Sequence, residues 1–245
     1  MIIKNPLTIV NQGKENKVPQ VVDGSAIELT ADDLAGATKI RKFAFCGHTG
    51  LTSVEIPDSI TTIGNSAFEQ CTNLISVELP NGIKSIAENG FYYCTSLSTI
   101  NVPDTLKSFG KAVFYYCKKL SSINIPYGVV SLPDNLFTTC QALTEITIPD
   151  TVWNIGNSVF SACTGLTTLT IPSKVTQIGQ YVFSQCTSLT EMTILATTPP
   201  KLSNTNSFNK TTALTTIYIP AGTLSAYQTA TNWSSFASKF VELSE

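Results

Sequence analysis

The chain has 245 residues, of which 42% are hydrophobic and 13% charged, and its formal net charge is −2. That length can bury a sizeable core, and the scarcity of charge predicts a surface covered by Ser, Thr and Asn. With no cluster of Lys and Arg, and no apolar run near the roughly 20 residues of a membrane span, the sequence argues against nucleic-acid binding by charge and against a membrane-spanning helix.

Residues 1–38 precede the regular part of the chain, and we expect them to form an N-terminal cap. The segments PLTIV at 6–10 and SAIELT at 25–30 have strand-like composition. Thr30 to Leu34 has the pattern of an N-cap residue followed by a first helical turn. The opening sequence MIIKNPLTIVNQGKENK is too polar for a secretory signal, so the chain is either made without one or is a mature chain from which one has been removed.

From residue 39 to residue 220 the sequence repeats every 23 residues. One position of six consecutive units is always cysteine: Cys71, Cys94, Cys117, Cys140, Cys163 and Cys186. Segments align without gaps, as in ITTIGNSAFEQCTNLISVELP at 60–80 and IKSIAENGFYYCTSLSTINVP at 83–103. An earlier copy has His48 in the cysteine position, and the last copy resumes at Leu214 after an insertion near 197–200. A period of 23 lies in the range of leucine-rich repeats.

Each unit contains the fragment L-x-x-V/I-x-I, which predicts a short strand. Because alternate residues of a strand face the same way, Val77 and Leu79 should point inward while Glu78 points outward. The proline that follows ends the strand, and an aliphatic pair, usually a glycine, and a helical turn with a phenylalanine come next. Stacked units should form one parallel sheet of about eight short strands, roughly 35–40 Å long, with helical turns on the opposite side.

The unit resembles the BspA-type leucine-rich repeats of bacteria. Their pattern I-G-x-x-A-F-x-x-C-x-x-L-x-x-I-x-I-P matches Ile63 to Cys71 position by position, and the resemblance covers about 40–195 and, less closely, 208–220. It implies a leucine-rich-repeat solenoid, a right-handed β-α superhelix capped at both ends, without enzymatic activity or fixed site residues. It also implies a place on cell surfaces, among secreted adhesins or among phage-associated proteins.

Residues 221–245 are expected to form the C-terminal cap, because 218–240 looks like the usual cap of the family. The segment AGTLSAYQTA at 221–230 predicts a helix, and Trp233 and Phe236 are available to fill the last core layer. The three parts, 1–38, 39–220 and 221–245, are expected to form one domain.

The cysteine column has several chemical interpretations. Free cysteine is a small hydrophobe, so a reduced ladder in the core is favoured over disulfides between neighbouring units or a metal site, which needs converging ligands. His48 is the only histidine, which argues against a multi-histidine metal site or a hydrolase triad; a Cys46 nucleophile with His48 as its base is the alternative.

Paired carboxylates suggest one further chemistry. Glu55 and Glu78 occupy equivalent outward positions about 5 Å apart, which suits a retaining glycosidase pair. They lie on an open sheet face with no inserted loop to form a pocket, so we expect no catalytic residue, no metal and no cofactor.

Two surfaces vary along the repeat and are candidates for partner contact. The first lies between the phenylalanine and cysteine columns and comprises Tyr92, Tyr93, Tyr115, Tyr116, Lys118 and Lys119. Tyrosine combines contact area with a polar tip, which suits recognition of protein or carbohydrate. The second candidate is the outward strand face, with Glu55, Glu78, Asn101, Asn124, Glu145, Glu191 and Tyr218.

The sequence therefore predicts a non-catalytic binding or adhesion module that presents an extended solenoid surface to a protein or glycan partner. We expect a monomer on a bacterial cell surface or secreted, if a signal peptide has been removed. The alternative is a leaderless cytoplasmic or phage-associated protein, or a structural protein that self-assembles through its tyrosines.

Overall fold

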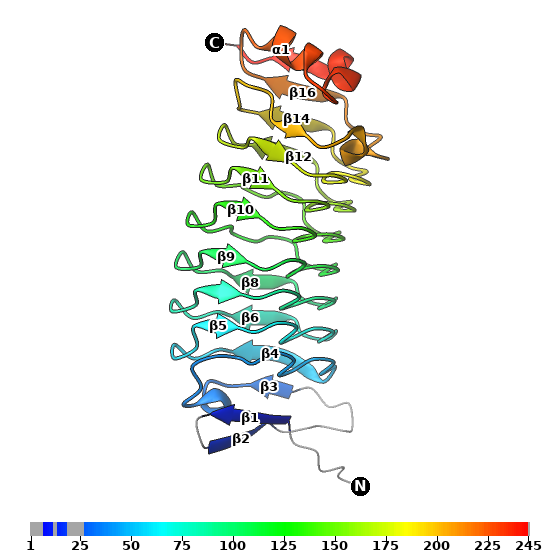
Figure 1. The fold of residues 1–245 in the computed structure, drawn as a ribbon. Helices are drawn as coiled ribbons and strands as arrows, with labels where there is room; N and C mark the ends of the chain where they lie inside the picture. Colours follow the sequence, from blue (N-terminus) through cyan, green and yellow to red (C-terminus); the bar gives the residue numbers. More distant parts are fainter. Residues whose placement is uncertain (1–6, 12–13, 19–26, 245) are drawn as a thin grey trace.

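The computed structural model describes residues 7–11, 14–18 and 27–244. The chain forms an elongated solenoid of stacked coils, with the two termini at opposite ends (Figure 1). Each 23-residue unit makes one coil, and strands of neighbouring coils pair in parallel at the same position of the repeat, as Ser53 pairs with Ser76 and Ser76 with Thr99. The expected solenoid is confirmed.

The L-x-x-V/I-x-I fragments form one face of the solenoid, which we call the strand face. Its two four-stranded sheets contain β3 (Ile27–Leu29), β4 (Leu51–Glu55), β6 (Ser76–Glu78) and β8 (Thr99–Asn101), and then β12 (Thr168–Ile171), β14 (Glu191–Ile194), β16 (Thr216–Ile219) and β17 (Phe240–Glu242). Val77 is buried and Glu78 exposed, so the predicted alternation is correct. The predicted single sheet is instead interrupted, because the segments 122–125 and 145–148 form no strand. We call these two segments the parted rungs.

A second face, which the sequence analysis did not predict, consists of two-residue strands at the aliphatic pairs. One group is β5 (Thr62–Ile63), β7 (Ser85–Ile86) and β9 (Ser108–Phe109); the other is β10 (Ser131–Leu132), β11 (Asn154–Ile155), β13 (Gln177–Ile178) and β15 (Lys201–Leu202).

This second face is also interrupted, between β9 and β10, and the sequence contains the reason. The Ala87 N–H donates to the Ile63 carbonyl at 2.9 Å, and Gly110 donates in the same way to Ile86 at 2.7 Å. The next residue in this column is Pro133, which has no N–H to donate.

The helical turn expected around each phenylalanine is a series of tight turns instead. In the coil of Phe68, Ser66 and Gln70 have left-handed backbone conformations, with φ of 52° and 60°. This arrangement directs alternate N–H groups at the next coil: those of Ser66, Phe68 and Gln70 donate to its carbonyls at 2.9, 2.9 and 2.7 Å. Bonds between coils thus replace the bonds within a helical turn, and the solenoid is built of strands and turns rather than as a β-α superhelix.

The core is a set of continuous columns. The phenylalanine rings from Phe45 to Phe183 are fully buried and stack with centroids 5.0 to 6.2 Å apart and planes within 11° of parallel. Each coil alone would leave its apolar edge in water, whereas the stack buries it on both sides.

The two ends of the stack are covered differently. At the N-terminal end, β1 (Leu7–Asn11) and β2 (Lys14–Val18) form an antiparallel hairpin near β3 (Figure 1). The turn expected at Thr30 to Leu34 is the 3-10 helix η1 (Asp32–Leu34), and the Asp33 carboxylate accepts hydrogen bonds from both the N–H and the hydroxyl of Thr30 at 2.9 and 2.8 Å.

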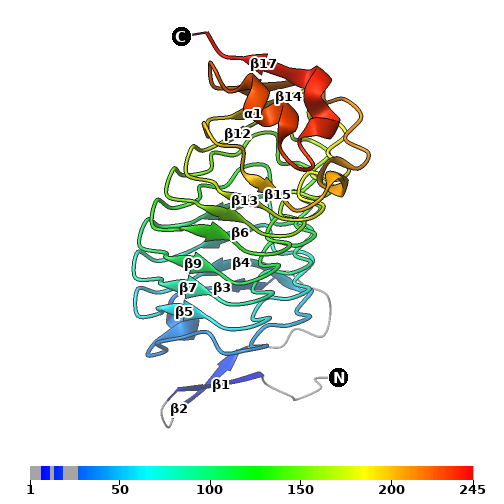
Figure 2. The same cartoon turned by 45° about the horizontal axis from the view of Figure 1, so that its top comes forward.

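At the C-terminal end, α1 (Leu224–Thr229) and the 3-10 helix η3 (Ser234–Lys239) lie over the last coils (Figure 2). Another 3-10 helix, η2 (Thr205–Phe208), precedes them. Trp233 is fully buried and its indole N–H donates to the Pro200 carbonyl at 2.7 Å. Phe236 is partly buried, and β17 adds an unpredicted strand to the sheet. None of the helices in the described residues is long and apolar enough to span a membrane.

The interrupted strand face predicts a difference in hydrogen exchange. Backbone amides of 122–125 and 145–148 make no bonds to neighbouring coils, whereas those of β12 and β14 are paired. We expect the amides of the parted rungs to exchange at least about ten times faster than those of β12 and β14, measured by mass spectrometry of the native protein. Equal protection in the four segments would show that the sheet is continuous in solution.

Candidate functional site

Four tyrosine rings gather on one edge of the solenoid, and we call Tyr92, Tyr93, Tyr115 and Tyr116 the tyrosine array. Tyr92 stacks on Tyr115 of the next coil with ring centroids 4.8 Å apart and planes 8° apart. Tyr93 stacks on Tyr116 with ring centroids 4.4 Å apart and planes 4° apart. Within one coil the centroids are 4.9 Å apart for Tyr92 and Tyr93 and 5.2 Å apart for Tyr115 and Tyr116. The 23-residue repeat therefore brings the four predicted tyrosines into one cluster.

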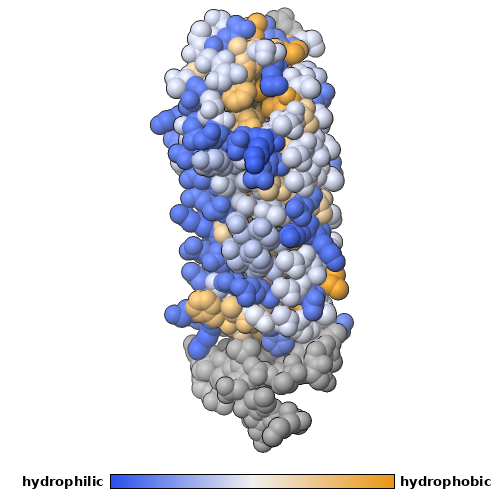
Figure 3. Space-filling model, turned by 90° about the vertical axis from the view of Figure 1, so that its right-hand side faces the viewer, coloured by the Kyte–Doolittle hydropathy of each residue, from blue (hydrophilic) through white to orange (hydrophobic). Residues whose placement is uncertain are grey.

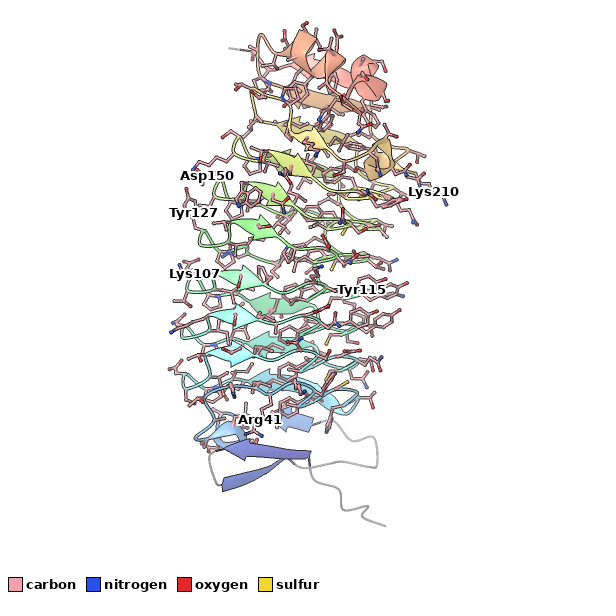
Figure 4. All side chains as sticks on the ribbon, in the orientation of Figure 1. Arg41, Lys107, Tyr115, Tyr127, Asp150 and Lys210 are labelled. Carbon is pink, nitrogen blue, oxygen red and sulfur yellow. The ribbon has the colours of Figure 1, made fainter. Side chains whose placement is uncertain are left out.

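The backbone presents this array on a narrow edge of the molecule. Tyr93 and Tyr116 are the left-handed residues of their turns, with φ of 59° and 62°, and all four side chains are half-buried. Tyr115 lies on the edge opposite Lys107, Tyr127 and Asp150 (Figure 4). Seen face on, this edge is mostly hydrophilic or neutral along its middle, with more apolar surface towards its ends (Figure 3).

The two lysines beside the array point to different places. The Lys118 ammonium lies 5.1 Å from the centroid of the Tyr116 ring, a cation–π arrangement. Lys119 instead lines a separate shallow hollow with Asn73 and Ser98. Burial, followed by the charges of neighbouring tyrosines, raises the pKa of Tyr92, so this phenol remains neutral and able to donate a hydrogen bond near neutral pH.

The strand face places the second set of predicted residues in two separate groups. Glu55 and Glu78 are exposed neighbours in register and line a shallow hollow of about 210 Å³ with Glu28. Asn101 has a structural role, because its side chain accepts from the Leu79 N–H at 2.8 Å and donates to the Leu79 carbonyl at 3.1 Å.

The other predicted residues of this face lie further along the solenoid. Asn124 and Glu145 stand on the parted rungs, while Glu191 is exposed on β14 and Tyr218 is half-buried on β16. No loop inserted among these strands screens the carboxylates from water, so the arrangement lacks the enclosure that a glycosidase pair requires.

A hollow of the surface lies where the strand face is interrupted, and the sequence analysis did not predict it. It measures about 710 Å³ and is lined by residues of five successive coils, including Ile123, Ile146 and Glu145. Pro133 was the available signal, because it interrupts the glycine and alanine column of the second face in the same part of the stack. We call this hollow the groove.

The six column cysteines are buried and free, and each thiol donates to the carbonyl of the phenylalanine one coil earlier, at 3.0 to 3.3 Å. Thr211 takes the same place in the last coil, donating to Phe183 at 2.6 Å. Burial raises the pKa of Cys71 and Cys186 to about 12, which removes the reactive thiolate near neutral pH. The column therefore acts as part of the core.

His48 and Cys46 do not form an activated pair. His48 Nδ1 is buried without a hydrogen-bond partner in the described structure, and burial lowers the pKa of its ring. Cys46 is exposed, and partial burial together with the charge of Glu69 raises its pKa. Among the residues that the structure describes, no group of three or more His, Cys, Asp or Glu side chains could hold a metal ion.

Coils of 23 residues with parallel strands, phenylalanine stacks and a cysteine column define a leucine-rich-repeat solenoid. The sequence profile of the BspA type leucine rich repeat region matches residues 38–141 and 108–236 in six copies. The chain therefore belongs to the BspA-type leucine-rich-repeat family. No curated protein matches it.

Solved bacterial leucine-rich-repeat structures resemble the fold. One from Bacteroides ovatus is 18% identical, with 89% of this chain and 70% of that chain covered and a TM-score of 0.51. One from T. pallidum is 30% identical over 58% of this chain and 78% of that chain, with a TM-score of 0.47. A leucine rich cell surface protein from Faecalibacterium prausnitzii is 24% identical over 80% of this chain and 66% of that chain, with a TM-score of 0.43.

The cysteine geometry predicts selective alkylation. Of the seven cysteines only Cys46 is exposed, whereas burial holds the pKa of the other six well above its usual value. Iodoacetamide near pH 8 should add one label to the native protein and seven after denaturation, counted by intact mass. A Cys46→Ser control should take no label in the native state. Rapid native labelling of Cys117 would contradict a closed core column.

Proposed function

We propose that this protein is a non-catalytic binding module that presents its tyrosine array to a protein or glycan outside the cell. The observation that carries the proposal is the pair of stacked tyrosine couples, at 4.4 and 4.8 Å, on one edge of a rigid solenoid. Such rings supply a large amphipathic contact area, and their phenolic groups can bond to amide or sugar hydroxyl groups.

The turns that carry the array support this role because they are pre-organised. The backbone N–H of Tyr93 donates to Tyr115 at 2.8 Å, and that of Tyr116 donates to Thr138 at 2.8 Å. Since the rings are already stacked and their backbones fixed, binding would require little further ordering, which favours affinity. Lys118 adds a positive charge for a carboxylate on the partner, whether an acidic side chain or an acidic sugar.

Absence of catalysis is part of the proposal and rests on the chemistry of the side chains. The buried thiols are held in the neutral form by their raised pKa, and Glu55 and Glu78 stand on an open face. A nucleophile needs a base within hydrogen-bonding reach, and a general acid needs an environment that excludes water. The buried thiols and the pair Glu55 and Glu78 fit neither arrangement, which supports a role in binding.

Removing the tyrosine rings should abolish the contact without unfolding the protein. With Ser at all four positions of the array, we expect binding to fall more than about 100-fold, because aromatic anchors dominate interface energies. The stacked couples contribute about 1–3 kcal/mol in all, so the thermal midpoint should fall by less than about 10 °C. Binding is measured on arrays of glycans and of secreted and membrane proteins, and the thermal midpoint by calorimetry.

A matched control is Tyr127→Ser, because Tyr127 is 63% exposed on the opposite edge of the solenoid. It should leave binding at the wild-type level. If the control and the four-fold variant bind equally, the tyrosine array is not the contact site. If the four-fold variant instead unfolds, the rings serve the packing of the coils rather than recognition.

The location of the protein separates the proposed surface role from its alternative. Fractionation of the native source with an antibody should find the protein on protease-accessible cells or in the culture medium. Detection only in the cytosol or in induced phage particles would reject the adhesin role and favour a phage-associated protein. Concentration-dependent oligomers that the four-fold variant fails to form would instead indicate self-assembly through the array.

A further inference from the structure

Neighbouring coils separate progressively on the strand face around the parted rungs. At the start of each strand, a backbone N–H normally donates to the previous coil, as Thr190 donates to Thr167 at 2.9 Å. The distance lengthens to 3.3 Å from Thr167 to Thr144 and to 3.4 Å from Ser121 to Ser98. At the centre, Thr144 donates no bond to Ser121 within the described chain. The same two coils are instead bonded just before this point, where the Ala142 N–H donates to the Lys118 carbonyl at 3.0 Å, and they are unbonded along the parted rungs.

The sequence at this junction differs from most others in the groups that join neighbouring coils. The Thr105 hydroxyl donates to the carbonyl of Ile83 at 3.1 Å, and Thr151 donates to Val129 at 2.8 Å. The equivalent residue between them is Gly128, which has no hydroxyl, but Gly82 holds the same position where β6 and β8 are paired. Pro133, in contrast, removes a backbone donor from the second face. Pro133 therefore distinguishes this junction, because it removes a bond between the two coils on the second face.

The same two coils remain joined at the tyrosine edge. Phe114 and Tyr116 donate backbone bonds to the next coil at 3.0 and 2.8 Å, and Lys111 forms an ion pair of 3.4 Å with Asp134. The junction is consequently a wedge, closed at the tyrosine edge and open at the strand face.

The groove at the open side has an apolar floor and an acidic rim. Ile123 is 9% exposed, and Ile146 is only partly buried, whereas Val77 in the same column is 2% exposed. The lining contains the carboxylates of Glu145 and Asp150 and no lysine or arginine.

The backbone of the groove also bears on which ligand fits it. The parted rungs, 122–125 and 145–148, have no hydrogen bonds to neighbouring coils, although strands of this face elsewhere are paired. Ser122, Asn124, Glu145 and Thr147 are exposed, so the unpaired backbone N–H and C=O groups beside them are open to a partner that supplies main-chain donors and acceptors. A sugar supplies hydroxyl groups but not the regular alternation of N–H and C=O that a strand requires.

We propose that the groove is a second binding site, which takes an extended peptide carrying apolar residues flanked by a basic residue. The peptide runs along the parted rungs and pairs with their backbone, a mode of recognition that uses main-chain bonds for affinity and side-chain pockets for specificity. Its apolar side chains cover Ile123 and Ile146, and its basic side chain meets Glu145 or Asp150. This inference rests on the proposed binding function but uses a different surface.

The test uses the whole protein and a peptide of sequence Lys-Thr-Val-Thr-Val-Thr-Lys with blocked ends. We expect a dissociation constant between about 1 μM and 1 mM by calorimetry, and slower hydrogen exchange at 122–125 and 145–148 when the peptide is bound. The same peptide with N-methyl groups on its valine amides should bind at least about ten times more weakly, because it cannot complete the main-chain bonds.

Glu145→Lys is the variant that reverses the charge of the rim, and it should weaken binding at least about ten-fold. Its matched control is Glu191→Lys, an exposed residue of the same outward column on the paired strand β14, which should bind normally. Both residues are exposed, so neither variant is expected to disturb the fold, which circular dichroism checks.

Three results would overturn the proposal: no binding of the peptide, equal binding of the N-methylated peptide, or equal weakening by the two variants. The four-fold tyrosine variant separates the two sites, because it should bind the peptide as the wild type does while losing the array partner. If the tyrosine array proves not to bind a partner, the peptide result still decides the groove proposal. If the groove binds no peptide, the four-fold variant still decides the proposed function of the array.

Discussion

Hydrogen bonds between the backbones of neighbouring coils are the interaction on which the rest of this protein depends. They run along the strand face, the second face and the phenylalanine turns, each time joining residues close to one repeat apart. Because a coil is about as thick as one strand spacing, every side chain at one repeat position stands directly over its equivalent in the next coil. The phenylalanine stack, the cysteine column and the tyrosine array all follow from this spacing.

The same constraint accounts for the residues that are allowed at each position. A core position accepts only side chains that stack on themselves, so rings lie parallel and each thiol meets a carbonyl of the preceding coil. Where the stack ends, Thr211 provides the donor in place of a thiol and Trp233 covers the last layer. Surface positions can carry different side chains from coil to coil, which is why recognition is expected there and not in the core.

Several features were predictable from the sequence and others were not, for physical reasons. The sequence predicted the period, the inward Val77, the outward Glu78 and the family, because each depends on the spacing of residues or on their alternation along the chain. The second face was missed because two-residue strands carry too little pattern, although their pairing is visible once the coils are stacked. The helical turn was predicted wrongly, since left-handed residues such as Gln70 direct their bonds at the next coil.

The sequence by itself determined the repeat, its core columns and the neighbourhood of the four tyrosines, since a regular period places equivalent residues side by side whatever their detailed geometry. The tertiary structure decided how the coils meet. It decided that Lys118 lies over Tyr116 while Lys119 faces another hollow, and that the Asn101 side chain bonds to the backbone of Leu79. It also decided that the coils part around 122–125 and 145–148. At this junction Pro133 removes a backbone donor, and the effect of one missing bond on the opposite face is visible only when neighbouring coils are packed together.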